Sequence, residues 1–408
     1  MNTSRVIALS SAVAFGTQVL FALITLRLFS PQEVGEFSVI SQIGFFWMTL
    51  ALAQSQLGLL ANQHVPAHIA AQHAWCTSAL RGLALLPIAA LAVWFSQLAL
   101  WPALLWALLL AFCQMGWMLA QSLTLRVGSA WQQAAVRVLP PVTAAATALT
   151  AALLGASVGW NGPTLVLSAL LGYAVGAAWL VPALRARDLH ASDSSSIAST
   201  PKAIAAASTH QSDPRSASLR MAHTLVDALL ATAIVVVWQR MYSAEETGYM
   251  SALLRVLGFV PAVVHMAWAQ VVLARAAANN TQPTSTNAWW IGMGAFTCVV
   301  ALGALCAITL YNGWLDERWN GVWPYIAPLV LWHGSACLSA AFAHRPFQTQ
   351  SASAYSWACM GLAAAQAVTL LLPLGLDQPM DVTDHISAFA WVSGLGLLGL
   401  TAWMARLR

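Results

Sequence analysis

The sequence has 408 residues, of which 59% are apolar and only 7% are charged, and its formal net charge is +4. So few charged side chains leave too little polar surface to keep a folded chain of this length in solution. The composition therefore excludes an ordinary soluble domain and favours an integral membrane protein. We expect membrane lipids to surround it and no nucleic acid to be among its partners.

Apolar stretches of about twenty residues, the length that crosses a hydrocarbon core of about 30 Å as an α-helix, recur along almost the whole chain. The first stretch is too long for a signal-peptide core and has no small-residue cleavage site after it, so we expect a retained helix. In all, the pattern predicts about twelve transmembrane helices. In chain order they are Val6 to Phe29, Phe37 to Leu60, Leu80 to Gln97, Trp101 to Ala120, Val138 to Ala156, Thr164 to Leu184, Leu219 to Gln239, Gly248 to Leu273, Trp289 to Tyr311, Val322 to His344, Tyr355 to Leu374 and Ile386 to Met404.

Charged residues between these spans are divided by sign. Basic residues such as Arg81 and Lys202 fall on one side of the expected membrane, and acidic residues such as Glu33 and Asp384 fall mainly on the other. The positive-inside rule then predicts that both termini are cytoplasmic, which agrees with an even number of spans.

The chain is predicted to consist of two halves, residues 1–184 and 219–408, joined by a cytoplasmic linker, 185–218, that is rich in Ser, Ala and Thr. A first hairpin, residues 27–38, and a second hairpin, residues 240–251, share identical residues at one fixed offset. The pairs are Arg27 and Arg240, Ser30 and Ser243, Glu33 and Glu246, Gly35 and Gly248, and Ser38 and Ser251. Any short turn between membrane helices can contain a capping Ser, first-turn acids and a packing Gly, so chance similarity remains an alternative to duplication. If the halves are duplicates, each with an even number of spans, they are parallel repeats.

The first hairpin, Ser30-Pro31-Gln32-Glu33-Val34-Gly35-Glu36-Phe37, the second copy at 243–249, and Ala269-Gln270-Val271-Val272-Leu273 resemble the polysaccharide-biosynthesis flippases of the Wzx type. These flippases share a superfamily with the multidrug and toxin extrusion antiporters. The resemblance implies two six-helix halves around a central cavity that opens alternately to each side. It also implies that the chain carries an undecaprenyl-diphosphate-linked oligosaccharide, an O-antigen or exopolysaccharide unit, across a bacterial inner membrane. Partners would then be the lipid-linked oligosaccharide and other polysaccharide-assembly proteins, with no cofactor.

Two charged residues lie well inside predicted spans, away from their ends: Asp227 in the seventh and Arg255 in the eighth. A charge near the bilayer centre costs a few kcal/mol or more, so such residues normally face a cavity or a partner. One interpretation is a structural salt bridge between the two. The other assigns Arg255 to binding an anionic cargo group and Asp227 to ion coupling.

Other polar residues inside the spans are weaker candidates. His265 is a potential proton carrier, because imidazole titrates near neutral pH, or a histidine satisfied by a nearby carbonyl. The amides of Gln18, Gln42 and Gln114 either bind sugar hydroxyls or link helices. Trp268 either stacks on a sugar ring or fills space.

No metal site is expected. Pro66 separates His64 from His68 and His73 and prevents one helical face from presenting them, and no Cys or carboxylate completes the ligand set. The six cysteines lack paired metal spacing and are interpreted as small apolar residues.

Three functional classes follow from these observations. A lipid-linked oligosaccharide flippase leads, and a multidrug-type cation antiporter with the same fold is second. A polytopic polysaccharide polymerase or ligase is third, because no nucleophile, acid pair or Gly-rich phosphate loop occurs at a defined spacing. We therefore expect a transporter and not an enzyme.

Overall fold

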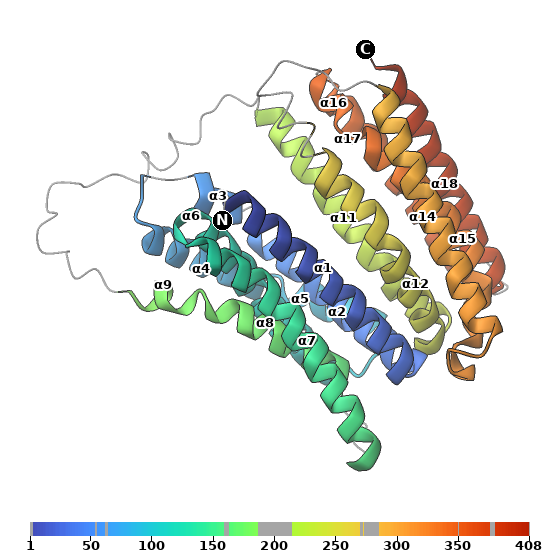
Figure 1. Ribbon diagram of the computed structural model, residues 1–408, viewed down its shortest axis with the longest axis horizontal. Helices are drawn as coiled ribbons and strands as arrows, with labels where there is room; N and C mark the ends of the chain where they lie inside the picture. The colour runs from blue at the N-terminus through green and yellow to red at the C-terminus, as the bar shows by residue number, and fades with distance from the viewer. Residues whose placement is uncertain are drawn as a thin grey trace, which may run out of the picture. The chain divides into compact units, whose positions relative to one another are not determined.

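The structure is a computed structural model, and it divides the chain into two compact units. Unit 1 comprises Met1–Leu28 and Val39–Pro214, and unit 2 comprises Phe29–Ser38 and Arg215–Arg408. Throughout the described residues the secondary structure is helical, with no strand (Figure 1). The described residues are 3–53, 55–61, 64–158, 163–186, 214–269, 272, 285–349, 351–375 and 380–407.

These units differ from the predicted halves in one segment. Residues 29–38, most of the first hairpin, group with unit 2 although they are near the N-terminus. Residues 187–213, most of the predicted linker, lie outside the described residues. The linker and its cytoplasmic location therefore stay predictions.

In unit 1, α1 packs along α7, and α6, α7 and α8 pack against one another. Small residues allow the close approach, as where Gly116 of α6 faces the Ala177 side chain of α8. The helices of the N-terminal part of the chain are α1 (Thr3–Leu28), α2 (Pro31–Leu52), α3 (Ser55–Ala61), α4 (Ala67–Ala84), α5 (Leu86–Phe95), α6 (Leu100–Val127), α7 (Ala130–Val158), α8 (Thr164–Ala178) and α9 (Val181–Arg185).

In unit 2, α15 is the central helix, in contact with α12, α14 and α18. Pro328 lies inside α15 without ending it, as expected for a helix whose neighbours surround it. The helices of this part of the chain are α11 (Pro214–Met241), α12 (Ala244–Val263), the π-helix η1 (Val264–Ala269), α14 (Ser285–Tyr311), the 3₁₀-helix η2 (Glu317–Val322), α15 (Trp323–Phe342), α16 (Arg345–Gln348), α17 (Ala352–Leu371), η3 (Leu372–Gly375) and α18 (Val382–Arg406).

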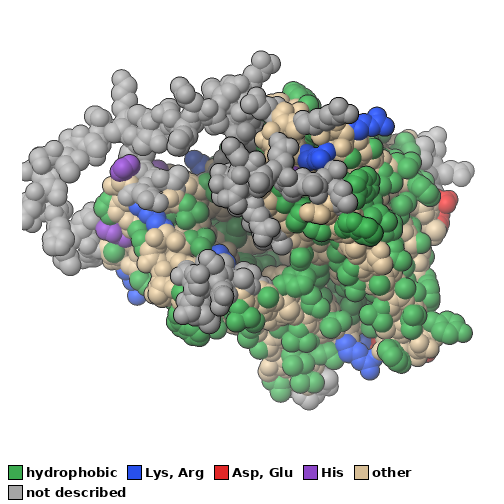
Figure 2. All heavy atoms as spheres, turned by 45° about the horizontal axis from the view of Figure 1, so that its top comes forward, with side chains coloured by type: hydrophobic (Ala, Val, Ile, Leu, Met, Phe, Trp, Pro, Cys, Tyr) green, Lys and Arg blue, Asp and Glu red, His purple; other side chains and the backbone are tan. Residues whose placement is uncertain are grey.

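Many helices have the length and polarity of membrane spans. Among the described residues, eight are long and apolar enough to cross a bilayer, and α4 with α5, bent by 47°, forms a ninth if the pair is one span. Two shorter apolar helices are Ala12–Leu28 and Thr164–Ala178. Figure 2 shows hydrophobic side chains over much of the helical surface in view, which suits a lipid environment and not water. The predicted all-α membrane fold is confirmed.

Each predicted span overlaps a helix, and the largest difference in a boundary is at the start of the third span. The third span was predicted to begin at Leu80, whereas α4 begins at Ala67, directly after Pro66. The first turns of α4 contain His68, Gln72 and His73, so hydropathy alone does not mark them as part of a membrane segment.

The second helices of the two halves are interrupted at the same position of the repeat. After α2 ends at Leu52, Ala53 has a φ of 39°, a left-handed conformation that residues other than Gly rarely adopt. In the second copy α12 changes to the π-helix η1 at Val264. At the offset that relates Gly35 to Gly248, Ala53 corresponds to Met266 within η1.

Both hairpins have the predicted caps. Ser30 and Glu33 form a reciprocal capping box at the start of α2, with the Ser30 hydroxyl donating to the Glu33 carboxylate at 2.8 Å. The Ser243 hydroxyl caps α12 by accepting from the Glu246 amide at 3.0 Å. The sequence prediction of a capped helix with acids in its first turn is confirmed in both copies.

The hairpin glycines also pack as predicted, and they do so reciprocally within unit 2. A Cβ at Gly35 would overlap the carbonyl oxygen of Ala244, and a Cβ at Gly248 would overlap that of Pro31. Pro31 and Ala244 occupy equivalent positions of the two hairpins. The first turns of α2 and α12 therefore cross at a distance that only glycine permits at both positions.

Candidate functional site

Unit 2 encloses a cavity of about 640 Å³ between α11, η1, α15, α17 and α18. Its walls combine aromatic side chains, such as Trp332 and Tyr355, with hydroxyl and amide groups, such as Ser339 and Gln366. Of the described residues that line it, Asp227 is the one carboxylate, and none is Lys or Arg. The volume falls in the range of small-molecule sites, about 300–1,000 Å³.

An ion pair lies on the α11 wall of the cavity. His223 Nε2 lies 3.1 Å from Asp227 Oδ2, and the two residues are one helical turn apart on the same face. The Asp227 side chain is 58% exposed, against 18% for His223, so the carboxylate faces the open space. The pair therefore places a carboxylate and an imidazole side by side on the cavity wall.

Two residues of α17 line the cavity beside this pair. The Tyr355 ring meets the imidazole edge-on at a centroid distance of 5.9 Å, and Cys359, one turn further along α17, lines the same cavity. The ring contact links His223 to a helix that is far away in the sequence.

Of the two interpretations of Asp227 and Arg255, the salt bridge between them finds no support in the described contacts, which give Asp227 the partner His223. Arg255 instead donates from Nη2 to the Ser38 hydroxyl at 3.0 Å, and its Cζ lies 4.5 Å from the centre of the Phe37 ring. His223 is one turn from Asp227 on the same helix, so the two side chains can meet without any tertiary contact. This explains why His223 is the partner of Asp227.

The structure brings together two of the predicted residues in one cavity of unit 2. Asp227 and His265 line the same cavity. Trp268 donates from Nε1 to the Ala341 carbonyl at 3.0 Å and packs beside an apolar cluster, which suits the space-filling alternative. Arg255 and Trp268 belong to unit 2, whereas the three glutamines belong to unit 1. They are the exposed Gln18 of α1, the half-buried Gln42 of α2 and the half-buried Gln114 of α6.

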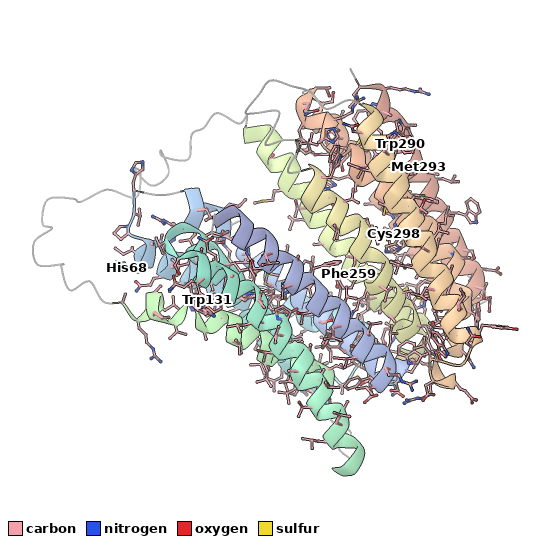
Figure 3. All side chains as sticks on the ribbon, viewed as in Figure 1. His68, Trp131, Phe259, Trp290, Met293 and Cys298 are labelled. Carbon is pink, nitrogen blue, oxygen red and sulfur yellow. The ribbon has the colours of Figure 1, made fainter. Side chains whose placement is uncertain are left out.

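Unit 1 has a smaller cavity of about 500 Å³ near the start of α4, lined by His68 (Figure 3) together with Gln132 and Trp179. Among the described residues no group of three or more His, Cys, Asp or Glu is placed to hold a metal ion. This cavity has no charged lining residue other than a histidine.

A buried aromatic cluster lies where α11 turns into α12. Tyr325 donates to the Glu246 carboxylate at 2.6 Å and accepts from Trp238 Nε1 at 2.9 Å. The imidazole of His385 stacks on Trp238 at a centroid distance of 4.6 Å. The cluster links the second hairpin to α15 and α18 and stabilises this end of unit 2.

Tyr242, between α11 and α12, extends the cluster. Its hydroxyl lies 2.9 Å from His385 Nδ1, and His385 Nε2 lies 3.2 Å from the Thr369 carbonyl. Because that carbonyl can only accept, Nε2 carries a proton, and the Tyr242 hydroxyl also donates to the Met380 carbonyl at 3.3 Å. Burial, followed by the negative charges of Asp381 and Glu246, raises the pKa of Tyr242 to about 12. The phenol therefore remains a neutral donor at physiological pH.

The sequence did not identify three residues of the cavity cluster. His223 is one turn before Asp227, and the i, i+4 spacing of an imidazole and a carboxylate was the available signal. No local signal connects Tyr355 and Cys359 with this pair, because α17 reaches α11 only through the tertiary fold.

No family model matches the chain, and no curated protein sequence matches it. Among solved structures it is similar to the inward-facing conformation of a multidrug resistance MATE family transporter of the MOP superfamily. The TM-score is 0.53 at 10% sequence identity, and the match covers 97% of this chain and 93% of that chain. The chain is thus an all-α integral membrane protein, and it shares its fold with that transporter over nearly its whole length.

Proposed function

We propose that the chain is a transporter that moves a lipid-linked oligosaccharide across the bacterial inner membrane, with both termini in the cytoplasm. The observation that carries this proposal is the cavity of unit 2. It has a volume of about 640 Å³ and is lined by aromatic and hydrogen-bonding groups inside a membrane fold. Placing so many polar groups within membrane-spanning helices costs free energy unless they form hydrogen bonds with a polar ligand or with one another. The likeness of fold to a MATE family transporter supports transport as the general activity.

The composition of the cavity suits a sugar. Aromatic faces such as Trp332 and Tyr355 pack against the apolar faces of sugar rings, while Ser339, Ser356 and Gln366 offer hydrogen bonds to hydroxyl groups. In this proposal Arg255 exchanges its bond to Ser38 for the anionic diphosphate of the carrier lipid. Gln18, Gln42 and Gln114 of unit 1 stay candidate sugar-binding amides, as the sequence indicates, and no catalytic step is required.

A multidrug-type cation antiporter is the second candidate, and the Asp227 carboxylate favours it. An exposed acid beside aromatic rings attracts organic cations by charge and by cation–π contact. Under this alternative Asp227 and His265 bind a cation or a coupling proton in turn.

Gene deletion separates the two candidates. We expect loss of a surface glycan, or accumulation of its lipid-linked precursor, with unchanged resistance to cationic drugs. Loss of drug resistance with normal glycan display would instead support the antiporter and contradict the flippase.

Complementation of the deletion tests the cavity itself. Trp332→Ala removes an aromatic wall and should lower glycan display at normal protein levels. The matched control is Trp131→Ala, because Trp131 of α7 is 76% exposed and lines neither cavity (Figure 3). Equal display by the two variants would contradict a sugar-binding role for this cavity.

A further inference from the structure

The described wall of the cavity in unit 2 carries a carboxylate but no guanidinium or ammonium group. Asp227 supplies the carboxylate, and none of the described residues that line the cavity is Lys or Arg. Arg345 is close in sequence to the lining residue Phe347 but does not line the cavity. Its Nη1 instead donates to the carbonyls of Ala405 and Leu407 at the end of α18, at 2.8 and 2.9 Å. An anionic ligand in this space therefore finds no guanidinium or ammonium partner on the described wall.

Within the ion pair on this wall, the carboxylate is the group that a ligand meets. The Asp227 side chain is 58% exposed, whereas the side chain of His223 is 18% exposed. His223 Nε2 lies against one carboxylate oxygen, Oδ2, at 3.1 Å. A carboxylate accepts hydrogen bonds through both of its oxygens and donates none. Asp227 can therefore accept from a hydroxyl or an ammonium group of a ligand while it keeps His223 as its partner.

A second acceptor and an anchored aromatic ring line the same cavity. Gln366 Nε2 donates to the Ser393 hydroxyl at 2.7 Å, which orients the amide, and its carbonyl oxygen is an acceptor. The Trp332 ring lies edge-on against the buried ring of Phe389, at a centroid distance of 5.1 Å. These groups suit a ligand that has an apolar ring face and donates hydrogen bonds from its edge.

We propose that this cavity selects sugars without a negative charge, either neutral or amino sugars, and that Asp227 is the residue that rejects acidic sugars. A hydroxyl or an ammonium group donates to the Asp227 carboxylate. The carboxylate of a uronic acid instead meets a like charge inside a membrane protein, where little solvent screens the repulsion. This selectivity rests on the proposed function, because it takes the ligand of the cavity to be a sugar. The anionic diphosphate of the carrier lipid is assigned to Arg255, which does not line the cavity.

The experiment compares related sugars on the full-length protein in lipid nanodiscs. Methyl β-D-glucoside is neutral, methyl β-D-glucuronide differs from it by a carboxylate, and methyl β-D-glucosaminide differs from it by a protonated amine. Titrations followed by saturation-transfer difference NMR, which detects weak sugar binding, give an apparent Kd for each. We expect the Kd of the glucuronide to be at least about 10-fold higher than that of the glucoside, and the glucosaminide to bind at least as tightly as the glucoside. Equal binding of glucuronide and glucoside, or no saturation transfer to any of these sugars, would overturn the proposal.

Two pairs of variants assign the selectivity to Asp227 and the binding to this cavity. Asp227→Asn removes the charge at constant size and should bring the Kd of the glucuronide to within about 3-fold of that of the glucoside. The matched control is Asp384→Asn, because Asp384 is exposed in the first turn of α18, does not line the cavity and should leave the ratio unchanged. Trp332→Ala should weaken binding of the glucoside, whereas the exposed Trp131→Ala should not. An unchanged ratio in Asp227→Asn, or unchanged glucoside binding in Trp332→Ala, would contradict the proposal.

The comparison of sugars on the unaltered chain needs no variant, so the proposal stays testable if Asp227→Asn does not fold. Its failure is also distinct from failure of the proposed function. Loss of glycan display on gene deletion, together with equal binding of glucuronide and glucoside, would support the flippase and overturn the selectivity. Selective binding of the glucoside, together with normal glycan display after deletion, would support the selectivity and contradict transport of a surface glycan.

Discussion

Gly35 and Gly248, which occupy matched positions in the two hairpins, each face the backbone carbonyl of the residue that begins the other hairpin's helix. Gly35 faces Ala244, and Gly248 faces Pro31. The contact is reciprocal, so the two copies support each other at the start of α2 and α12. This relationship favours duplication over chance similarity as the origin of the shared residues.

The first prediction concerns this crossing. Gly35→Ala or Gly248→Ala should each lower the stability of the folded protein by about 1–3 kcal/mol, the usual range for overpacking, because backbone atoms must move. The melting midpoint in detergent, followed by size-exclusion chromatography, measures the loss. Gly361→Ala and Gly294→Ala are controls, since no atom lies within 4 Å of an added Cβ there. In helices these control changes should be neutral or slightly stabilising. An unchanged midpoint in both hairpin variants would contradict the close crossing.

The second prediction concerns Arg255 and Asp227. Because they have different partners, Arg255→Ala and Asp227→Ala should affect stability additively, with a coupling energy below about 0.5 kcal/mol in a double-mutant cycle. Rescue of one variant by the other would contradict this arrangement and restore the salt bridge between them. Arg255→Lys should retain part of the activity of a cargo-binding Arg255, since the charge remains while the planar donor fork is lost.

The third prediction concerns the aromatic cluster. Tyr325→Phe removes the donor to Glu246 and the acceptor for Trp238 Nε1, and each buried polar group left unpaired costs about 1–3 kcal/mol. We expect a lower melting midpoint. Tyr311→Phe is the control, because Tyr311 is 84% exposed at the end of α14 and should tolerate loss of its hydroxyl. Equal midpoints for the two variants would show that the cluster contributes little to stability.

The fourth prediction is topological. In a chain without its native cysteines, Ser195→Cys in the linker should react with a membrane-impermeant maleimide only when the cytoplasmic face is accessible. Asp381→Cys, at the start of α18, should react from the outer face. Labelling of position 195 from the outer face would eliminate the predicted topology with cytoplasmic termini.

The sequence predicted those features that depend on neighbouring residues. The membrane helices follow from runs of apolar residues, and the caps of α2 and α12 follow from a Ser three residues before a Glu, since both depend on contacts within a few turns. The site was predicted less well. The sequence grouped Asp227 with His265, and the two residues line one cavity, but for Arg255 it left open a salt bridge with Asp227 or a role in binding cargo, and it did not name His223.

Tertiary packing determines the remaining members of the site. Tyr355 contacts His223 and Cys359 lines the same cavity, and no periodicity in α11 or α17 specifies that these segments meet. Arg255 likewise contacts Phe37 and Ser38 because the first turns of α2 belong to unit 2. A charge inside a span indicates that some partner exists, but the fold decides which one.

The interruptions at Ala53 and at Val264–Ala269 affect the stiffness of the second helix in each half. A regular α-helix transmits a force as a rigid rod, because every turn is tied to the next by equivalent hydrogen bonds. Where α2 changes to a left-handed residue and α12 changes to a π-helix, that series of equivalent bonds ends. Each second helix therefore leaves regular α-helical hydrogen bonding at the matched position of its own sequence, so neither copy is one uniform rod over its predicted span.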